Sequence, residues 1–381
     1  MAFQSLSTVS FRNLADAKIN TAAKDVFLVG ENGQGKTNFL EALYFCSYAS
    51  SFRGVKDSDL ACSGKGSSGA DFSAAAVLKG FRDAAEDSVF QNQISVKVEK
   101  LKKTITLDGK KISDRKDLLD TVPVVVFCHE DMEFVSGSQE RRRWFFDQTQ
   151  SLYDPLYLDD LRKYRRVLKT RNAVLKDAKL GAGYQKTSEL LDALDPQLAE
   201  YGLRLMEKRI TAAGVFSAVF SPLYREVSHI EGININYVPS WKGINGIEGI
   251  AARLAERRAA DIAQGITLSG PHRDCYNFIC AVSGAERAAD FSGNASTGQR
   301  RLLALLLRIA QSRCFSDYTG KRPVLLLDDV LLELDGEKRH RFLSVMPDYE
   351  QAFFTFLPEE PYKKYSKSNT LVYNVIDGVI N

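Results

Sequence analysis

The chain has 381 residues, 44% of them hydrophobic and 26% charged, with a formal net charge of +3 at pH 7. This length suits two domains and can bury a core without disulfides or metal, and the small net charge does not by itself identify a nucleic-acid binder. Six scattered cysteines without a CxxC pair argue against a zinc site or a secreted disulfide scaffold. No signal peptide or membrane span is predicted, so we expect a cytoplasmic protein.

The N-terminal part alternates apolar and polar residues with the period of β-strands. Strands are predicted over residues 3–13, 26–29, 72–79 and 90–107. Asp108 and Gly109 predict a hairpin turn, because this dipeptide tolerates positive φ. The apolar run 122–128 predicts a strand covered on both faces, and the Gly- and Ser-rich residues 62–70 predict a loop within the same domain.

The rest of the chain changes from helical to mixed character. The predicted elements are a helical region over 138–226 with one strong break at Asp195-Pro196, a strand over 233–238, a helix over about 247–263, strand character over 266–283, a Leu-rich helix over about 297–315, a strand over 324–327, and then a helix, a strand and a β-rich tail. This order predicts an α/β head formed by residues 1–134 and 263–381, with a mainly α-helical arm domain, residues 135–262, inserted into it.

Residues 30–37, GENGQGKT, form a complete phosphate-binding loop between a predicted strand and a predicted helix. The glycines let the backbone wrap around a phosphate, with N–H groups and the helix N-terminus directed at the negative charge. Lys36 is expected to reach the β and γ phosphates of ATP, and Thr37 to hold Mg²⁺. The expected nucleotide contacts are Gly30, Glu31, Asn32, Gly33, Gln34, Gly35, Lys36, Thr37 and Asn38.

An apolar strand that ends in two aspartates follows in the C-terminal third, VLLLDD at residues 324–329. We expect Asp328 to bind Mg²⁺ directly or through water, and Asp329 to orient or deprotonate the attacking water. Asp329 and Lys36 are therefore the predicted catalytic residues. Alone, such a strand could simply end at an acidic turn, but together with the phosphate loop it indicates ATP hydrolysis.

A second anion site is predicted where the Leu-rich helix begins. Ser296 can cap this helix, Gly298 lets the backbone approach a phosphate closely, and Gln299 adds a donor in the first turn. Taken alone, the segment could be an ordinary helix start. The order of phosphate loop, serine-glycine helix start, paired aspartates and Glu333-Leu334-Asp335 resembles ATP-binding-cassette and SMC-like ATPases, which implies an ABC-type head and an ATP-dependent homodimer.

In detail the chain resembles the bacterial RecF recombination-repair proteins from end to end. The motifs that carry the resemblance are FRN (11–13), the phosphate loop followed by SFR (51–53), FCHEDMEFVSGSQERRRWFFD (127–147), YRRVLKTRN (164–172), SGPHRD (269–274), ASTGQRR (295–301) and LLLDDVLLELD (325–335). The departures from the family pattern, at His129, Cys275, Thr297, Leu331 and Leu332, remove no phosphate or metal ligand.

The resemblance implies a weak ATPase of recombinational repair that binds single- and double-stranded DNA without sequence preference, above all gapped DNA at single-strand/double-strand junctions. It implies partnership with RecO and RecR in loading RecA, and it implies that Arg12 approaches the nucleotide, that Arg53 faces DNA and that Thr355 is a γ-phosphate sensor. For His272 and Arg273, a structural hydrogen-bond network and a relay of the nucleotide state both remain open.

A basic face on the arm helix is formed by residues that recur at spacings of three and four: Arg162, Arg165, Arg166 and Lys169. Most such faces are merely solvated, but the family resemblance favours contacts to DNA phosphates that weaken with salt. Another class of function stays open. A cassette ATPase could couple hydrolysis to a transporter or a translation partner, and pull-down with DNA against membranes would separate the two.

Overall fold

The computed structural model describes residues 1–62, 71–83, 86–114, 116–119, 121–181, 183–280, 289–331 and 336–381. The chain divides into two compact units, residues 1–131 with 315–381, and residues 132–314. The first division lies close to the expected boundary after residue 134, whereas the second falls within the Leu-rich helix and not after residue 262. Residues 263–314 group with the arm because β10 (Cys275–Cys280) pairs antiparallel with β9 (Ile233–Val238).

The first unit contains a mostly parallel sheet with the strand order β15-β14-β3-β13-β12-β8. Its strands are β3 (Asp25–Val29), β8 (Val124–Phe127), β12 (Val324–Leu327), β13 (Gln351–Phe356), β14 (Thr370–Ile376) and the antiparallel β15 (Val379–Ile380). Every residue of β3, β8, β12 and β13 is buried, which explains their continuous apolar sequences. The phosphate loop and the paired aspartates follow β3 and β12, so they lie at the same edge of this sheet.

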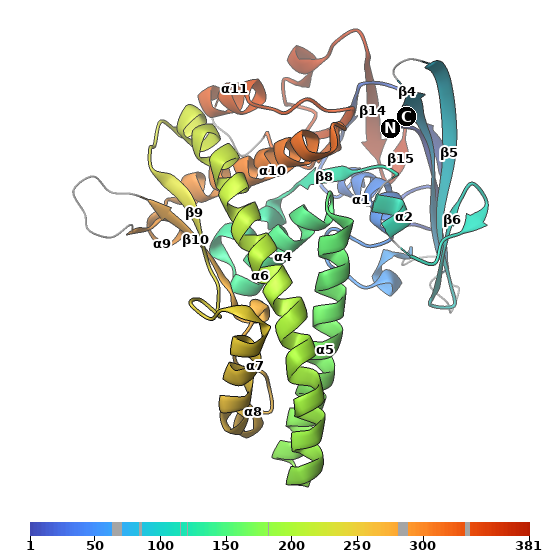
Figure 1. Ribbon diagram of the computed structural model, residues 1–381. Coiled ribbons are helices and arrows are strands. Elements are labelled where there is room, and N and C mark those ends of the chain that lie inside the picture. The colour runs from blue at the N-terminus through green and yellow to red at the C-terminus, as the bar shows by residue number, and fades with distance from the viewer. Residues whose placement is uncertain are drawn as a thin grey trace. The chain divides into compact units, whose positions relative to one another are not determined.

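The second sheet of this unit is antiparallel, with the order β2-β1-β4-β5-β6-β7. Its strands β4, β5 and β6 are labelled in Figure 1. Its strands are β1 (Ala2–Val9), β2 (Ala17–Asn20), β4 (Phe72–Asp83), β5 (Glu86–Glu99), β6 (Lys102–Leu107) and β7 (Lys110–Lys111). The predicted hairpin turn is confirmed, since Asp108 and Gly109 have φ of 51° and 76°. The predicted strand 3–13 ends at Val9, because Ser10 and Arg12 take positive φ.

Helix α1 (Lys36–Tyr48) packs on strands of both sheets, which accounts for its almost complete burial. The unit also contains α2 (Lys116–Leu119) and α11 (Gly336–Ser344). Residues 63–70 of the predicted loop lie outside the described residues. The mixed α/β head expected from the sequence is present, and among the described residues no helix has the length and apolar character needed to cross a bilayer.

The second unit is mainly helical. Its further elements are α3 (Met132–Ser136), α4 (Gln139–Ser151), α5 (Pro155–Lys179), α6 (Tyr184–Ser228), α7 (Gly246–Glu256), α8 (Arg258–Gln264), β11 (Ala289–Asp290), α9 (Phe291–Asn294) and the start of α10 (Thr297–Thr319). Helices α5 and α6 run side by side (Figure 1). Their shared core includes Tyr157, Tyr164, Leu198 and Trp241.

The predicted break at Asp195-Pro196 is wrong, because α6 continues through Pro196. A proline inside a helix loses one backbone hydrogen bond, and tertiary contacts can offset that cost. Here the neighbouring Asp195 is buried and accepts hydrogen bonds from Arg171 at 2.7 Å and from Arg258 at 2.8 Å. Strand character over 266–283 is also shorter than predicted: β10 covers Cys275–Cys280, and residues beyond 280 in that segment are not described.

Candidate nucleotide site

The phosphate loop connects the buried end of β3 to α1 in the conformation that the motif requires. Gly33 and Gly35 have φ of 80° and 115°, a region that side chains disfavour. The buried Lys36 donates from Nζ to the carbonyl oxygens of Gly30 at 2.5 Å and Glu31 at 3.1 Å. The loop borders a cleft of about 270 Å³, whose lining includes Asn32, Gly33, Lys36, Thr37, Asn38, Arg53 and Asp329.

Two oxygen groups that suit a divalent cation meet beside this cleft. Thr37 Oγ1 donates to Asp328 Oδ1 at 2.9 Å. Burial, together with the charge of neighbouring Asp329, raises the pKa of Asp328 to about 6. Mg²⁺ is typically bound by one or two carboxylates together with substrate phosphates, so the donor set at Thr37 and Asp328 fits this ion. A cation there would also offset the cost of two adjacent carboxylates.

Asp329 is held by the neighbouring strand β13. Its backbone φ is 52°, and its N–H donates to Thr355 Oγ1 at 2.8 Å. The same hydroxyl lies 2.9 Å from Asp329 Oδ1 and 3.2 Å from Asp328 Oδ1. Because a hydroxyl has one proton, Thr355 can donate to only one carboxylate at a time. This contact couples the sensor residue expected from the sequence to both acidic groups.

Arg12 and Arg53 share the fully buried carboxylate of Glu41. Arg12 makes two hydrogen bonds to it, at 2.9 and 3.2 Å, and Arg53 Nη1 lies 3.7 Å from Oε2. Arg53 also donates to Asn38 Oδ1 at 3.1 Å and lines the cleft, whereas Arg12 is not among its lining residues. The residue expected to face DNA therefore lies at the nucleotide cleft, and the residue expected at the nucleotide is bound to Glu41.

A C-terminal hairpin turn holds the phosphate loop from outside the cleft. The N–H of Gly378 donates to the Gln34 carbonyl at 2.8 Å, and the N–H of Asp377 donates to Gln34 Oε1 at 2.6 Å. The Gly378 carbonyl accepts from Ala15 N–H at 2.9 Å. A Cβ on Gly378 would lie 1.8 Å from the Asn13 carbonyl oxygen, so only glycine fits this contact.

We expect Gly378→Ala to weaken ATP binding about tenfold or more, because the turn must move away from Gln34 and the loop loses two hydrogen bonds of about 1 kcal/mol each. Gly109→Ala is a matched control. Gly109 follows Asp108 in a turn of the same form, with φ of 76° against 79° at Gly378, but a Cβ there meets nothing within 4 Å. Equal losses of affinity for a fluorescent ATP analogue in both variants would contradict the steric argument.

The predicted signature helix begins as expected. Gln299 N–H donates to Ser296 Oγ at 3.2 Å, and Gln299 Oε1 accepts from Ser296 N–H at 2.8 Å, which is a reciprocal capping box. Ser296 and Gly298 are exposed, and a Cβ on Gly298 would meet nothing within 4 Å. This helix start belongs to the second compact unit, whereas the phosphate loop belongs to the first. Leu332 and the Glu333-Leu334-Asp335 motif lie outside the described residues.

The predicted basic face on α5 is exposed at all four of its positions, Arg162, Arg165, Arg166 and Lys169. Tyr164 and Val167 between them are buried, which agrees with the helical spacing.

Two residues near the phosphate loop make contacts that the sequence did not predict. Asn13 Nδ2 donates to the Gly33 carbonyl at 3.3 Å, and the carboxylate of Glu41 binds Arg12. Asn13 belongs to the FRN motif, so that motif could have pointed to it. Glu41 has no such local signal, because its partners Arg12 and Arg53 lie in other segments of the chain.

Comparison with known proteins places these features in one family. The family model described as RecF/RecN/SMC N terminal domain matches residues 2–380. The DNA replication and repair protein RecF of Treponema pallidum (strain Nichols) is 40% identical over 373 residues, covering 98% of this chain and 99% of the relative. RecF of Clostridium perfringens (strain SM101 / Type A) is 32% identical over 382 residues, covering 100% and 99%.

Solved structures show the same fold. A structure of the recombination mediator protein RecF with ATP in the RecFOR pathway is similar with a TM-score of 0.84 at 27% identity, covering 100% of this chain and 96% of that one. An Smc head domain from Pyrococcus furiosus is similar with a TM-score of 0.54 at 16% identity, covering 100% and 95%, and supports the fold alone.

Proposed function

The chain belongs to the RecF family of DNA replication and repair ATPases, and on that premise we propose that it is an ATP-gated DNA clamp of recombinational repair. The proposal rests on one observation: the candidate nucleotide-binding residues lie in two different compact units. The loop and Asp329 line one cleft, beside which Thr37 contacts Asp328, while Ser296 and Gly298 are exposed at a capped helix start in the other unit. A second copy would bring its Ser296 and Gly298 to the γ-phosphate.

Each residue at the cleft has a defined part in this proposal. Lys36 and the loop amides neutralise the β and γ phosphates. Asp329 orients the attacking water, and Thr355 fixes the direction of its carboxylate. Thr37 and Asp328 would hold Mg²⁺, which supplies further positive charge to the phosphates. Arg53, anchored by Asn38 and Glu41, adds a guanidinium to the cleft wall.

DNA would bind through phosphates along the exposed face of α5. The guanidinium and ammonium groups of Arg162, Arg166 and Lys169 provide a sequence-independent contact. We further propose that the clamp prefers gapped DNA and single-strand/double-strand junctions, and that it acts with RecO and RecR to load RecA. Support for these finer points comes from the family and from the RecFOR pathway in which its solved relative is described. Hydrolysis is expected to be slow, since a conformational step limits turnover.

We expect Asp329→Asn to retain ATP and to accumulate as a dimer, because the change removes the carboxylate that orients water but keeps the size of the side chain. Light scattering with and without Mg-ATP measures the mass, and binding to a junction DNA is measured at two salt concentrations. Affinity should fall as salt rises, with log K decreasing by about 0.9 per duplex phosphate neutralised. Normal ATP turnover by this variant, or DNA binding indifferent to salt and ATP, would overturn the proposal.

A further inference from the structure

A second cavity lies within the arm unit and shares no lining residue with the nucleotide cleft. It has a volume of about 390 Å³ and is bordered by α4, α5 and the turn Pro271–Arg273. Volumes of 300–1,000 Å³ are typical of small-molecule sites. Four of its lining residues are arginines, Arg143, Arg165, Arg209 and Arg273. We call it the arginine pocket.

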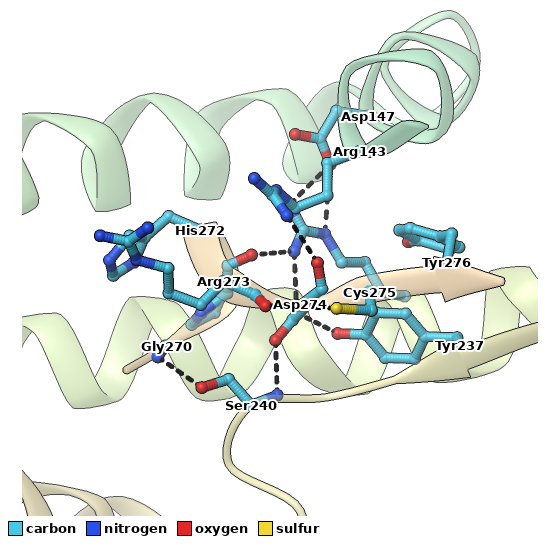
Figure 2. Close-up of polar contacts among 12 residues, drawn as sticks. Arg143, Asp147, Tyr237, Ser240, Gly270, His272, Arg273, Asp274, Cys275 and Tyr276 are labelled. Carbon is cyan, nitrogen blue, oxygen red and sulfur yellow. Dashed lines mark hydrogen bonds and ion pairs between the residues drawn. The ribbon is translucent and has the colours of Figure 1, made fainter. Parts of the chain in front are cut away.

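Arg209 is held between two buried carboxylates. It is buried and lies 2.8 Å from Asp147 Oδ1 and 2.9 Å from Asp274 Oδ2. Burial alone would lower its pKa, but these carboxylates hold it well above the ordinary value. Asp274 also accepts from Tyr237 and from Ser240 N–H (Figure 2). Arg209 therefore offsets one of the two negative charges of Asp147 and Asp274.

Arg143 forms no ion pair with a carboxylate of the described residues. It is half-buried, and its guanidinium donates to the backbone carbonyl of Asp274 at 2.7 Å, as Figure 2 shows. Burial and the nearby charge of Arg209 lower its pKa. A guanidinium has five N–H donors, so most of its capacity remains available. A partly buried cation in this position favours an anionic ligand.

The other two arginines complete the positive lining. Arg165 contacts Asp147 Oδ2 at 3.3 Å with a side chain that is 59% exposed. Arg273 is exposed, and its side chain makes no hydrogen bond or ion pair within the part of the chain that the structure describes. Glu140 is the remaining acidic residue of the lining. The four guanidiniums therefore outnumber the three carboxylates around them, which belong to Glu140, Asp147 and Asp274, and the pocket keeps a net positive charge.

His272 fixes the turn that carries Arg273 and adds no charge of its own. Its Nδ1 lies 2.7 Å from Tyr164 Oη on α5, and its Nε2 lies 2.9 Å from the Thr267 carbonyl. A carbonyl only accepts, so Nε2 carries the proton and Nδ1 accepts from tyrosine. Burial lowers the pKa of His272 to about 4, which keeps it neutral. From the sequence, His272 could belong either to a structural hydrogen-bond network or to a relay of the nucleotide state. The contacts to Tyr164 and Thr267 are those of a structural network.

Trp144 gives the pocket an aromatic wall. It lines the cavity, is 37% exposed, and stacks on Phe134 with ring centroids 5.8 Å apart. Arginines that track phosphates, together with an aromatic ring on which a base can stack, are the combination used by single-strand nucleic-acid sites.

We propose that the arginine pocket binds one nucleotide unit, with its phosphate held by Arg143, Arg165 and Arg273 and its base placed against Trp144. The phosphate has two possible sources, the backbone of a DNA single strand or a free nucleotide. Where the source is DNA, the inference rests on the proposed function. The site lies in the arm unit, so it is separate from the ATP cleft of the first unit.

The experiment uses oligo(dT), dTMP and inorganic phosphate as probes in the full-length Lys36→Ala variant, so that the ATP cleft does not contribute. Intrinsic fluorescence reports the pocket directly. The chain has two tryptophans, and Trp241 is only 1% exposed. We expect dTMP or oligo(dT) to quench the signal, and Trp144→Phe to remove the quench while calorimetry still detects binding.

Arg273→Gln should weaken binding of the nucleotide probe about tenfold, since it removes a charge-assisted hydrogen bond. Because this side chain is exposed and without a hydrogen-bonding partner, the change should leave the fold intact. Arg166→Gln, on α5 but outside the pocket lining, tests the DNA face separately. If it alone weakens oligo(dT) binding, the pocket inference is wrong and DNA binding stands.

The remaining outcomes also decide the question. Loss of dTMP binding in Arg273→Gln, in a protein that binds no oligo(dT), supports the pocket with a free nucleotide as the source and contradicts the DNA clamp. Binding of inorganic phosphate without any quench by dTMP, or equal affinity of wild type and Arg273→Gln for every probe, overturns the inference.

Discussion

Lys36→Ala should abolish ATP-dependent dimerisation and lower ATP affinity by about two orders of magnitude or more. The buried ammonium group lies against the Gly30 and Glu31 carbonyls, in the curve of the loop where the phosphates are expected. Its removal eliminates charge-assisted hydrogen bonds to two phosphates, worth about 1.5–3 kcal/mol each. Without bound ATP, the γ-phosphate cannot bridge to the Ser296 turn of a second copy.

Apparent mass by light scattering with and without Mg-ATP, together with affinity for a fluorescent ATP analogue, measures this effect. Lys56→Ala is the control, because Lys56 is exposed and absent from the lining of the cleft. An ATP-induced increase in mass that persists in Lys36→Ala would remove the basis of the nucleotide-gated dimer.

Arg209→Met should destabilise the arm unit by about 3–5 kcal/mol, the usual cost of removing one partner from a buried ion pair. The side chain is 3% exposed and those of its partners Asp147 and Asp274 are 5% and 1% exposed. Its Nη1 also donates to the Pro271 carbonyl at 2.6 Å. The substitution leaves the buried Asp274 without its ion-paired cation and Asp147 with only the exposed Arg165, and methionine restores only part of the volume.

The urea midpoint of unfolding, followed by circular dichroism, tests this expectation. Arg204→Met is matched to it, since Arg204 lies on the same helix and is ion-paired to Glu200 at 2.6 Å, but its side chain is 50% exposed. An exposed pair contributes about 0–1 kcal/mol. Similar midpoints for the two variants would show that burial does not determine the cost.

Features that depend on neighbouring residues were predictable from the sequence. The phosphate loop, the Asp108-Gly109 hairpin and the Ser296 cap are defined by local backbone preferences and short-range hydrogen bonds. The strands before residues 30 and 328 were predictable for a related reason. A strand that is buried on both faces has a continuous apolar sequence, and both of these strands do.

Features that depend on distant segments were not predictable in the same way. Pro196 breaks a helix by local rules, but packing of α6 and the ion pairs of Asp195 outweigh its cost. The position of Arg53 follows from Glu41 and Asn38, and the boundary within α10 follows from strand pairing across the arm. A single sequence contains no signal for such long-range pairs.

The place of β3 in its sheet has a consequence for synthesis on the ribosome. This strand, made early, lies between β13 and β14, which are encoded more than 300 codons later, and its loop is then fixed by Asp377 and Gly378. Pairings between such distant segments form slowly. A nascent chain that has not yet reached about residue 378 therefore lacks the strands and the turn that hold the phosphate loop. Such ribosome-bound intermediates should expose the apolar strand β3 to chaperones and should not bind ATP.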